Sequence, residues 1–79
     1  MTQAQQALAA IKTYVASRPI EDVRTHQLDV WETVIQDAQG YDEEASAKAD
    51  PSETNEEAVF ADGSRLWWNK ALQAWETGA

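Results

Sequence analysis

The chain has 79 residues, no cysteine and a formal net charge of −8, with 14 acidic against 6 basic residues. This length predicts one domain over residues 1–79 with a small core, and the lack of cysteine excludes disulfides and thiolate metal ligands. The excess of acids argues against direct binding to nucleic acid or to an anionic membrane, because both need clustered lysine and arginine. Since no long apolar run or signal peptide is visible, we expect a soluble, cytoplasmic monomer.

The negative charge is concentrated in the middle of the chain. Residues 1–20 carry a charge of +2 and residues 58–79 are neutral, whereas residues 21–57 hold twelve acids against only Arg24 and Lys48. Dense like charge costs folding free energy through mutual repulsion, so its presence in a small domain favours a surface that binds a basic partner. Two alternatives stay open: the acids form an ordinary solvated surface, or the chain comes from a high-salt host.

The first predicted element is a helix over about residues 2–17. Pro19 separates this helix from the next one, because proline does not fit in a helix interior. Apolar residues recur every three or four positions and therefore share one stripe of the helix. This stripe consists of Ala4, Ala7, Leu8, Ile11, Tyr14 and Val15.

A second helix is predicted over about residues 20–39, with Gly40 as its end. Its apolar and acidic residues separate cleanly onto opposite faces. We expect its apolar face to pack against the first helix, antiparallel to it. The apolar face contains Ile20, Val23, Val30, Trp31, Val34, Ile35 and Ala38, and the acidic face contains Glu21, Asp22, Asp29, Glu32 and Asp37.

Residues 42–57 are polar and acid-rich, with Pro51 as a breaker, which predicts an acidic linker or a short helix. The tryptophan-rich segment 58–79 allows two interpretations. Asp62-Gly63 resembles a two-residue turn of a short β-hairpin near residues 58–67. Alternatively, Ser64 starts a final helix, which we favour because the sequence NKALQAWE has high helix propensity. The predicted fold is therefore mainly α, a small domain of three to four helices, with the hairpin as the alternative.

The candidate binding residues are mostly carboxylates. Acids three or four positions apart on a helix have Cβ atoms about 5–6 Å apart, a spacing on the scale of DNA phosphates. Because Trp67 and Trp68 are adjacent, they cannot both enter the core, and an exposed Trp67 could anchor an interface. The predicted partner-binding residues are Asp29, Glu32, Asp37, Asp42, Glu43, Glu44, Glu53, Glu56, Glu57 and Trp67.

Catalytic and metal-binding patterns are not recognisable. His26 is the only histidine and falls on the polar face of the second helix, which predicts a surface residue. A nucleophile would need an adjacent base and an orienting third group, and no such spacing is visible. A calcium loop starting at Asp50 fails, because Asn55 stands where the required glycine should be. We therefore expect no enzymatic activity, no cofactor and no metal.

The helical start, the acidic run over residues 21–57 and the tryptophan-rich end RLWWNKALQAW resemble the small, acidic, cysteine-free anti-CRISPR proteins of phages and mobile elements. The nearest group acts on type I effector complexes. The likeness concerns the character of the whole chain, so no residue role is carried over. It implies a non-enzymatic inhibitor in the bacterial cytoplasm that mimics DNA on a basic protein or a type I CRISPR effector. The alternatives are an assembly module that docks through a Trp-rich apolar patch, and an antitoxin-like neutraliser of a basic protein.

Overall fold

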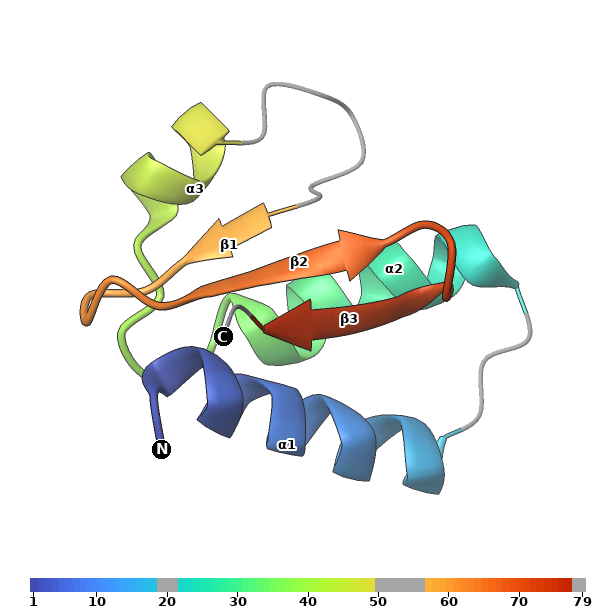
Figure 1. The fold of residues 1–79 in the computed structure, drawn as a ribbon. Helices are drawn as coiled ribbons and strands as arrows, with labels where there is room; N and C mark the ends of the chain where they lie inside the picture. The colour runs from blue at the N-terminus through green and yellow to red at the C-terminus, as the bar shows by residue number, and fades with distance from the viewer. Residues whose placement is uncertain (19–21, 50–56, 78–79) are drawn as a thin grey trace.

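The computed structural model describes residues 1–18, 22–49 and 57–77, although not the side chains of residues 47–49. These residues form a small α+β domain, in which three helical segments precede a three-stranded sheet (Figure 1). The second helix continues directly into a π-helical turn, η1. The elements are α1 (Gln3–Ser17), α2 (Val23–Val30), η1 (Trp31–Ile35), α3 (Glu43–Ala49), β1 (Glu57–Val59), β2 (Arg65–Asn69) and β3 (Ala74–Thr77).

The prediction of a mainly α fold is wrong, because residues 57–77 form an antiparallel sheet of order β1-β2-β3. The hairpin that we weighed as the alternative is formed by β1 and β2. Burial in β2 alternates with the two-residue period of a strand: Leu66 and Trp68 are buried, whereas the residues between and beside them are not. Trp75 pairs with Trp68 across the strands, so both indoles reach the core from one face of the sheet.

The turn between β1 and β2 also differs from the prediction. The Phe60 amide donates to the Ser64 carbonyl and the Gly63 amide donates to the Phe60 carbonyl, both at 2.9 Å, which closes a three-residue loop. Gly63 adopts a left-handed φ of 86°, whereas Asp62 does not have a positive φ. A two-residue type I′ turn would need positive φ at both positions. Asp62-Gly63 therefore makes a hairpin, but a longer one than predicted.

The final helix that we expected to start at Ser64 is absent: its residues form β2, a turn and β3. The Asn69 side-chain oxygen accepts hydrogen bonds from the amides of Ala71 (3.0 Å) and Leu72 (3.1 Å). Gln73 then takes a left-handed φ of 52°, which reverses the chain into β3. The local helix propensity of this segment is overridden, because the strand pairing buries Trp68 and Trp75 together whereas Leu72 is left 63% exposed.

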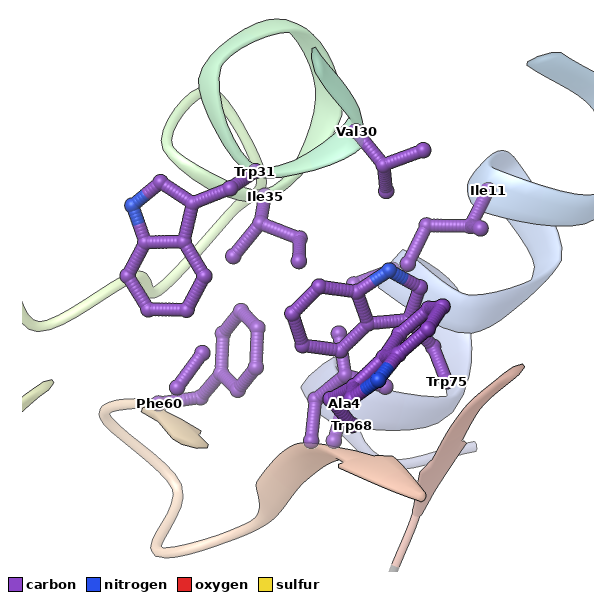
Figure 2. Packing of buried hydrophobic residues seen from close by; sticks show 11 residues of the cluster. Ala4, Ile11, Val30, Trp31, Ile35, Phe60, Trp68 and Trp75 are labelled. Atoms are coloured by element: carbon purple, nitrogen blue, oxygen red, sulfur yellow. The ribbon is translucent and has the colours of Figure 1, made fainter. Parts of the chain in front are cut away.

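Helix α1 and the α2–η1 helix contribute their apolar stripes to a core under one face of the sheet (Figure 2). Asp22 caps α2 by accepting from the Thr25 amide at 2.8 Å, so the helix begins later than residue 20. Val23, which we placed on the apolar face, is 38% exposed as a result of lying in the first turn. The buried apolar residues are Ala4, Ala7, Ile11, Val30, Trp31, Ile35, Ala58, Phe60, Leu66, Trp68 and Trp75.

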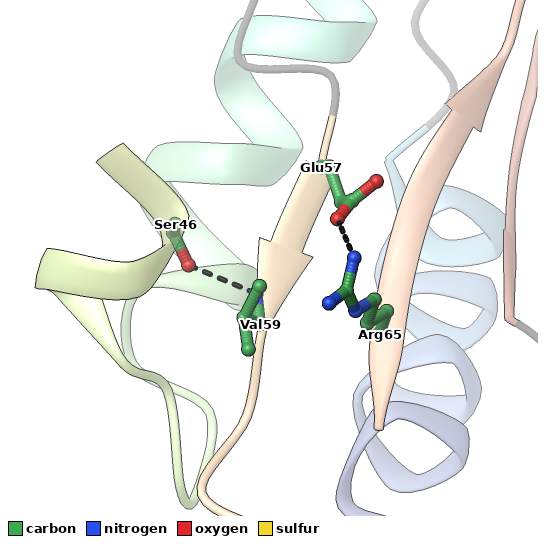
Figure 3. A network of polar contacts seen from close by, with 4 residues as sticks. All are labelled: Ser46, Glu57, Val59 and Arg65. Carbon is green, nitrogen blue, oxygen red and sulfur yellow. Dashed lines mark hydrogen bonds and ion pairs between the residues drawn. The ribbon is translucent and has the colours of Figure 1, made fainter. Parts of the chain in front are cut away.

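Helix α3 lies along the outer edge of β1 (Figure 3). The Val59 amide donates to the buried Ser46 hydroxyl at 2.9 Å, and the Val59 carbonyl accepts from the Asp42 amide at 2.9 Å. An open strand edge invites pairing with other chains, and here α3 and the residue before it, Asp42, occupy both outward-facing groups of Val59. Of the two options for residues 42–57, the structure has the short helix, while residues 50–56 lie outside the described part. No described helix combines the length and apolar character needed to cross a membrane.

Candidate functional site

The fold has two ends of opposite charge, which follow from its topology. In Figure 1, α1 and β2 run in one direction, whereas α2 and β3 run in the other. The start of α1, the β1–β2 turn and the segment before α3 therefore meet at one end. The end of α1, the start of α2 and the β2–β3 turn lie at the opposite end.

Hydrogen bonds between distant parts of the chain hold the first of these ends together. The Gln3 amide donates to the Asp62 carboxylate at 2.8 Å, and the Asp62 amide donates to the Gln3 side-chain oxygen at 3.0 Å. The Ala61 amide donates to the Gly40 carbonyl at 2.7 Å. Three segments thus converge, and two of them, residues 37–44 and the β1–β2 turn, bring acids to this region. We call it the acidic end, defined by Asp37, Asp42, Glu43, Glu44 and Asp62.

The opposite end, which we call the cationic end, is defined by Arg18, Arg24 and Lys70 and also contains the carboxylate of Asp22, the N-cap of α2. Arg18 follows α1, Arg24 is in the first turn of α2, and Lys70 begins the β2–β3 turn. Between Arg24 and Lys48 the sequence has six acids and neither lysine nor arginine. The uneven charge of the sequence thus gives the folded domain one more negative end and one more positive end.

Several predicted binding acids have a structural role. Asp29 is half-buried and accepts a hydrogen bond of 2.5 Å from the Tyr14 hydroxyl, which ties α2 to α1. Asp42 caps α3 by accepting from the Ala45 amide at 2.9 Å. Their carboxylates are oriented by these contacts. They therefore add to the electrostatic field of the surface more than they offer free oxygen atoms for contact with a partner.

Glu57 is likewise engaged, since it pairs with Arg65 across the β1–β2 ladder at 2.8 Å (Figure 3). Glu43 and Glu44 are exposed in the first turn of α3, where the helix dipole favours negative charge. Glu32 and Asp37 are exposed on and just after η1. Among the predicted set, Glu32, Asp37, Glu43 and Glu44 are exposed at the surface.

Sequence reasoning missed Asp62, which it treated only as a turn residue. Besides the Gln3 amide, Asp62 accepts hydrogen bonds from the Ser64 amide and hydroxyl, while Ser64 itself accepts from the Ala4 amide at 2.9 Å. The hydrogen bond from Gln3, followed by those from Ser64, lowers the pKa of Asp62 below its usual 3.8. The turn thus caps α1, and a stable carboxylate joins the acidic end.

Trp67 lies on the face of the sheet turned away from the core, as its half-buried state and its position between two buried neighbours indicate. It is cross-strand partner to Glu57 on one side and to Glu76 on the other. A hollow of about 430 Å³ beside it is also lined by Thr2 and Arg65. The remaining predicted residues, Glu53 and Glu56, lie outside the described part of the chain.

His26 differs from the predicted surface histidine. It is half-buried and packs edge-on against Trp68, with 5.6 Å between the ring centres and 72° between the planes. Burial lowers the pKa of His26 below 6.5, and the nearby charge of Asp29 opposes this shift. The sequence placed His26 on the second helix, but its contact with Trp68 depends on strand β2, which we did not favour.

Within residues 1–18, 22–49 and 57–77, no group of three or more histidine or acidic side chains is placed to hold a metal ion. Comparisons with protein-family models, with curated proteins and with solved structures found no significant match. We therefore infer a function from the distribution of charged and apolar residues on the surface.

Proposed function

We propose that this protein is a non-catalytic inhibitor that binds a basic, nucleic-acid-binding protein or nucleoprotein complex through its acidic end and excludes nucleic acid from it. The observation that supports the proposal is that acids of residues 37–44 and of the β1–β2 turn meet at one end of the fold, whereas cations are concentrated at the other. A surface that only had to stay hydrated would not need this polarity. A type I CRISPR effector is one partner of this chemistry.

The charge separation has a direct consequence for association. A molecule with a negative and a positive end is oriented as it approaches a basic groove, so the acidic end arrives first. Outward carboxylates such as Asp37 and Glu43 act mainly on the association rate and are screened by salt over about 8 Å at physiological ionic strength. We expect fast association that weakens steeply as salt is added.

The test compares two double variants with the same change in net charge. Asp37→Asn with Glu43→Gln removes two charges from the acidic end. Ala9→Lys with Thr13→Lys adds two positive charges at exposed positions of α1, away from that end. Immobilised protein is used to capture partners from bacterial lysate at low salt, and duplex DNA is then added as competitor.

Capture of a basic nucleic-acid-binding protein, its release by DNA and its loss only in the acidic-end variant would support the proposal. Equal losses in both variants would mean that net charge matters and that no located surface exists. Capture that resists both DNA and salt would contradict electrostatic mimicry. An antitoxin-like role would show as capture of a basic toxin in place of a DNA-binding partner.

The second candidate is an assembly module that docks through Trp67. The supporting observation is that this indole faces away from the core, beside a hollow that also borders Arg65. Trp67→Ala separates the candidates, since it should abolish capture by the apolar patch and spare capture by the acidic end. Circular dichroism of the variant checks that the sheet remains folded.

A further inference from the structure

A second feature lies apart from the acidic end, in a cavity of about 350 Å³ between α1, α2 and β3. We call it the α1–β3 cavity. Leu8, Ile11 and Val15 line it from α1, and Ala74 and Trp75 line it from β3. Its volume lies at the lower limit of the range of about 300–1,000 Å³ that is typical of small-molecule sites.

The cavity lies near the cationic end of the molecule. Ala16 and His26 complete its lining, and they lie within two residues of Arg18 and Arg24 respectively. Lys12 is exposed and also lines the cavity, and within the described part of the chain it makes no ion pair. An apolar cavity with an unpaired ammonium at its rim has the chemistry to hold an apolar chain with an anionic head.

The acids near this cavity are already engaged. Asp22 caps α2, and Asp29 accepts from the Tyr14 hydroxyl. Glu76, which borders an adjoining hollow together with Lys12, accepts a hydrogen bond of 3.0 Å from the Asn69 amide group. The negative charge of these acids lowers the attraction of the site for anions, but none of them forms an ion pair with the Lys12 ammonium.

Trp75 gives an independent indication. It is only 4% exposed, and its indole Nε1–H has no hydrogen-bond acceptor among the described residues. Figure 2 shows Trp75 beside Ile11, the residue with which it shares the cavity wall. A buried donor without an acceptor is costly to the protein, and the Trp75 ring in the cavity wall is where a bound ligand would be detected.

We propose that the α1–β3 cavity binds a small aliphatic carboxylate of the fatty-acid class. The alkyl chain contacts Leu8, Ile11 and Val15, and the carboxylate pairs with Lys12 at the rim. Because His26 is half-buried and its charged form is disfavoured, it contributes a ring edge to the apolar wall. This site is independent of the acidic end, so the two proposals can fail separately.

The experiment titrates the ¹⁵N-labelled full chain with octanoate below its micelle concentration and follows the four indole N–H resonances. We expect a saturable shift of the Trp75 resonance, while the Trp67 resonance on the opposite sheet face stays in place. Each methylene that enters the cavity should tighten binding about fourfold, so hexanoate should bind more weakly than octanoate. Octan-1-ol, which has the same chain without the charge, should bind more weakly than octanoate.

Substitutions complete the test. Lys12→Met should weaken octanoate binding about two- to fivefold, as expected for an exposed ion pair, and should leave octanol unaffected. Lys70→Met removes a cation from the same half of the molecule outside the cavity, and should leave both affinities unchanged. Ala16→Leu should obstruct the cavity, whereas Ala9→Leu at an exposed site on the same helix should not.

Absence of a saturable shift at millimolar octanoate would overturn the proposal, as would equal affinities for hexanoate and octanoate. A shift confined to Trp67 would place the binding on the wrong face. If Lys70→Met weakened binding as much as Lys12→Met, the carboxylate would not be held at the cavity rim.

Discussion

Replacing Ser46 with alanine should loosen α3 from the edge of the sheet. Ser46 is 1% exposed, and its hydroxyl accepts the only hydrogen bond that the Val59 amide makes among the described residues, at 2.9 Å. Loss of this acceptor leaves the partly buried Val59 amide without a hydrogen bond, which costs about 1–3 kcal/mol. Alanine regains about 0.5 kcal/mol of helix propensity in α3. The net loss in the free energy of unfolding should be about 0.5–2.5 kcal/mol.

That loss is large for a chain of this size. A domain of 79 residues has a free energy of unfolding of about 4–12 kcal/mol. Each kcal/mol shifts the melting temperature of a domain this small by about 4–8 °C. Thermal denaturation followed by circular dichroism therefore resolves the effect, and amide hydrogen exchange locates it at Val59.

Ser17→Ala is the matched control, since the Ser17 hydroxyl donates only to the Tyr14 carbonyl at an exposed position of α1. A surface change of this kind should stay within about 0.5 kcal/mol of the parent. If Ser46→Ala melted like Ser17→Ala and the Val59 amide kept its protection, the assignment of α3 as the cover of the β1 edge would be wrong.

Three further predictions concern the glycine positions, the histidine and the core. Gly40→Ala should be more destabilising than Gly63→Ala in thermal melts. Both have positive φ, but only at Gly40 would a Cβ displace a side chain, that of Gln3, whose oxygen accepts from the Asp62 amide; equal melting temperatures would contradict this. Because burial lowers the pKa of His26, its contribution to stability is present above pH 6.5 and is lost as the pH falls through the folded-state pKa. His26→Gln should therefore flatten the dependence of the urea midpoint on pH between about pH 7 and pH 5. An unchanged pH dependence of the midpoint would contradict this role of His26. Ile35→Ala, at a fully buried position, should cost about 2–5 kcal/mol in urea denaturation, and a loss below about 1 kcal/mol would place Ile35 outside the core.

The helical half of the fold could be predicted from the sequence, because one helix buries one stripe and the spacing of Ala4, Ala7 and Ile11 reports it directly. The sheet could not be predicted in the same way. Trp67, Trp68 and Trp75 fit a helical stripe as well as a strand pattern, and the choice depends on burying Trp68 against Trp75 across two strands. Such pairing is a tertiary contact that local propensity does not contain.

The acidic end was only partly predictable. The excess charge over residues 21–57 was visible, but the engagement of Asp29 with Tyr14 depends on helix packing. The addition of Asp62 to the acidic end depends on a hydrogen bond to a residue 59 positions earlier in the chain. Asp-Gly indicated a turn, and nothing local indicated what that turn would contact.

The cap that Asp62 and Ser64 place on α1 also affects how the chain matures during synthesis. Helix α1 leaves the ribosome before the sheet, but two of its first amides find their acceptors only after residues 62 and 64 have been added. At about 5–20 residues per second, the nascent helix waits for several seconds with only the local Thr2 cap. Helix α1 is thus completed by a turn made about 60 residues later, and a truncated chain that ends before residue 62 would carry an α1 whose first turn is free to fray.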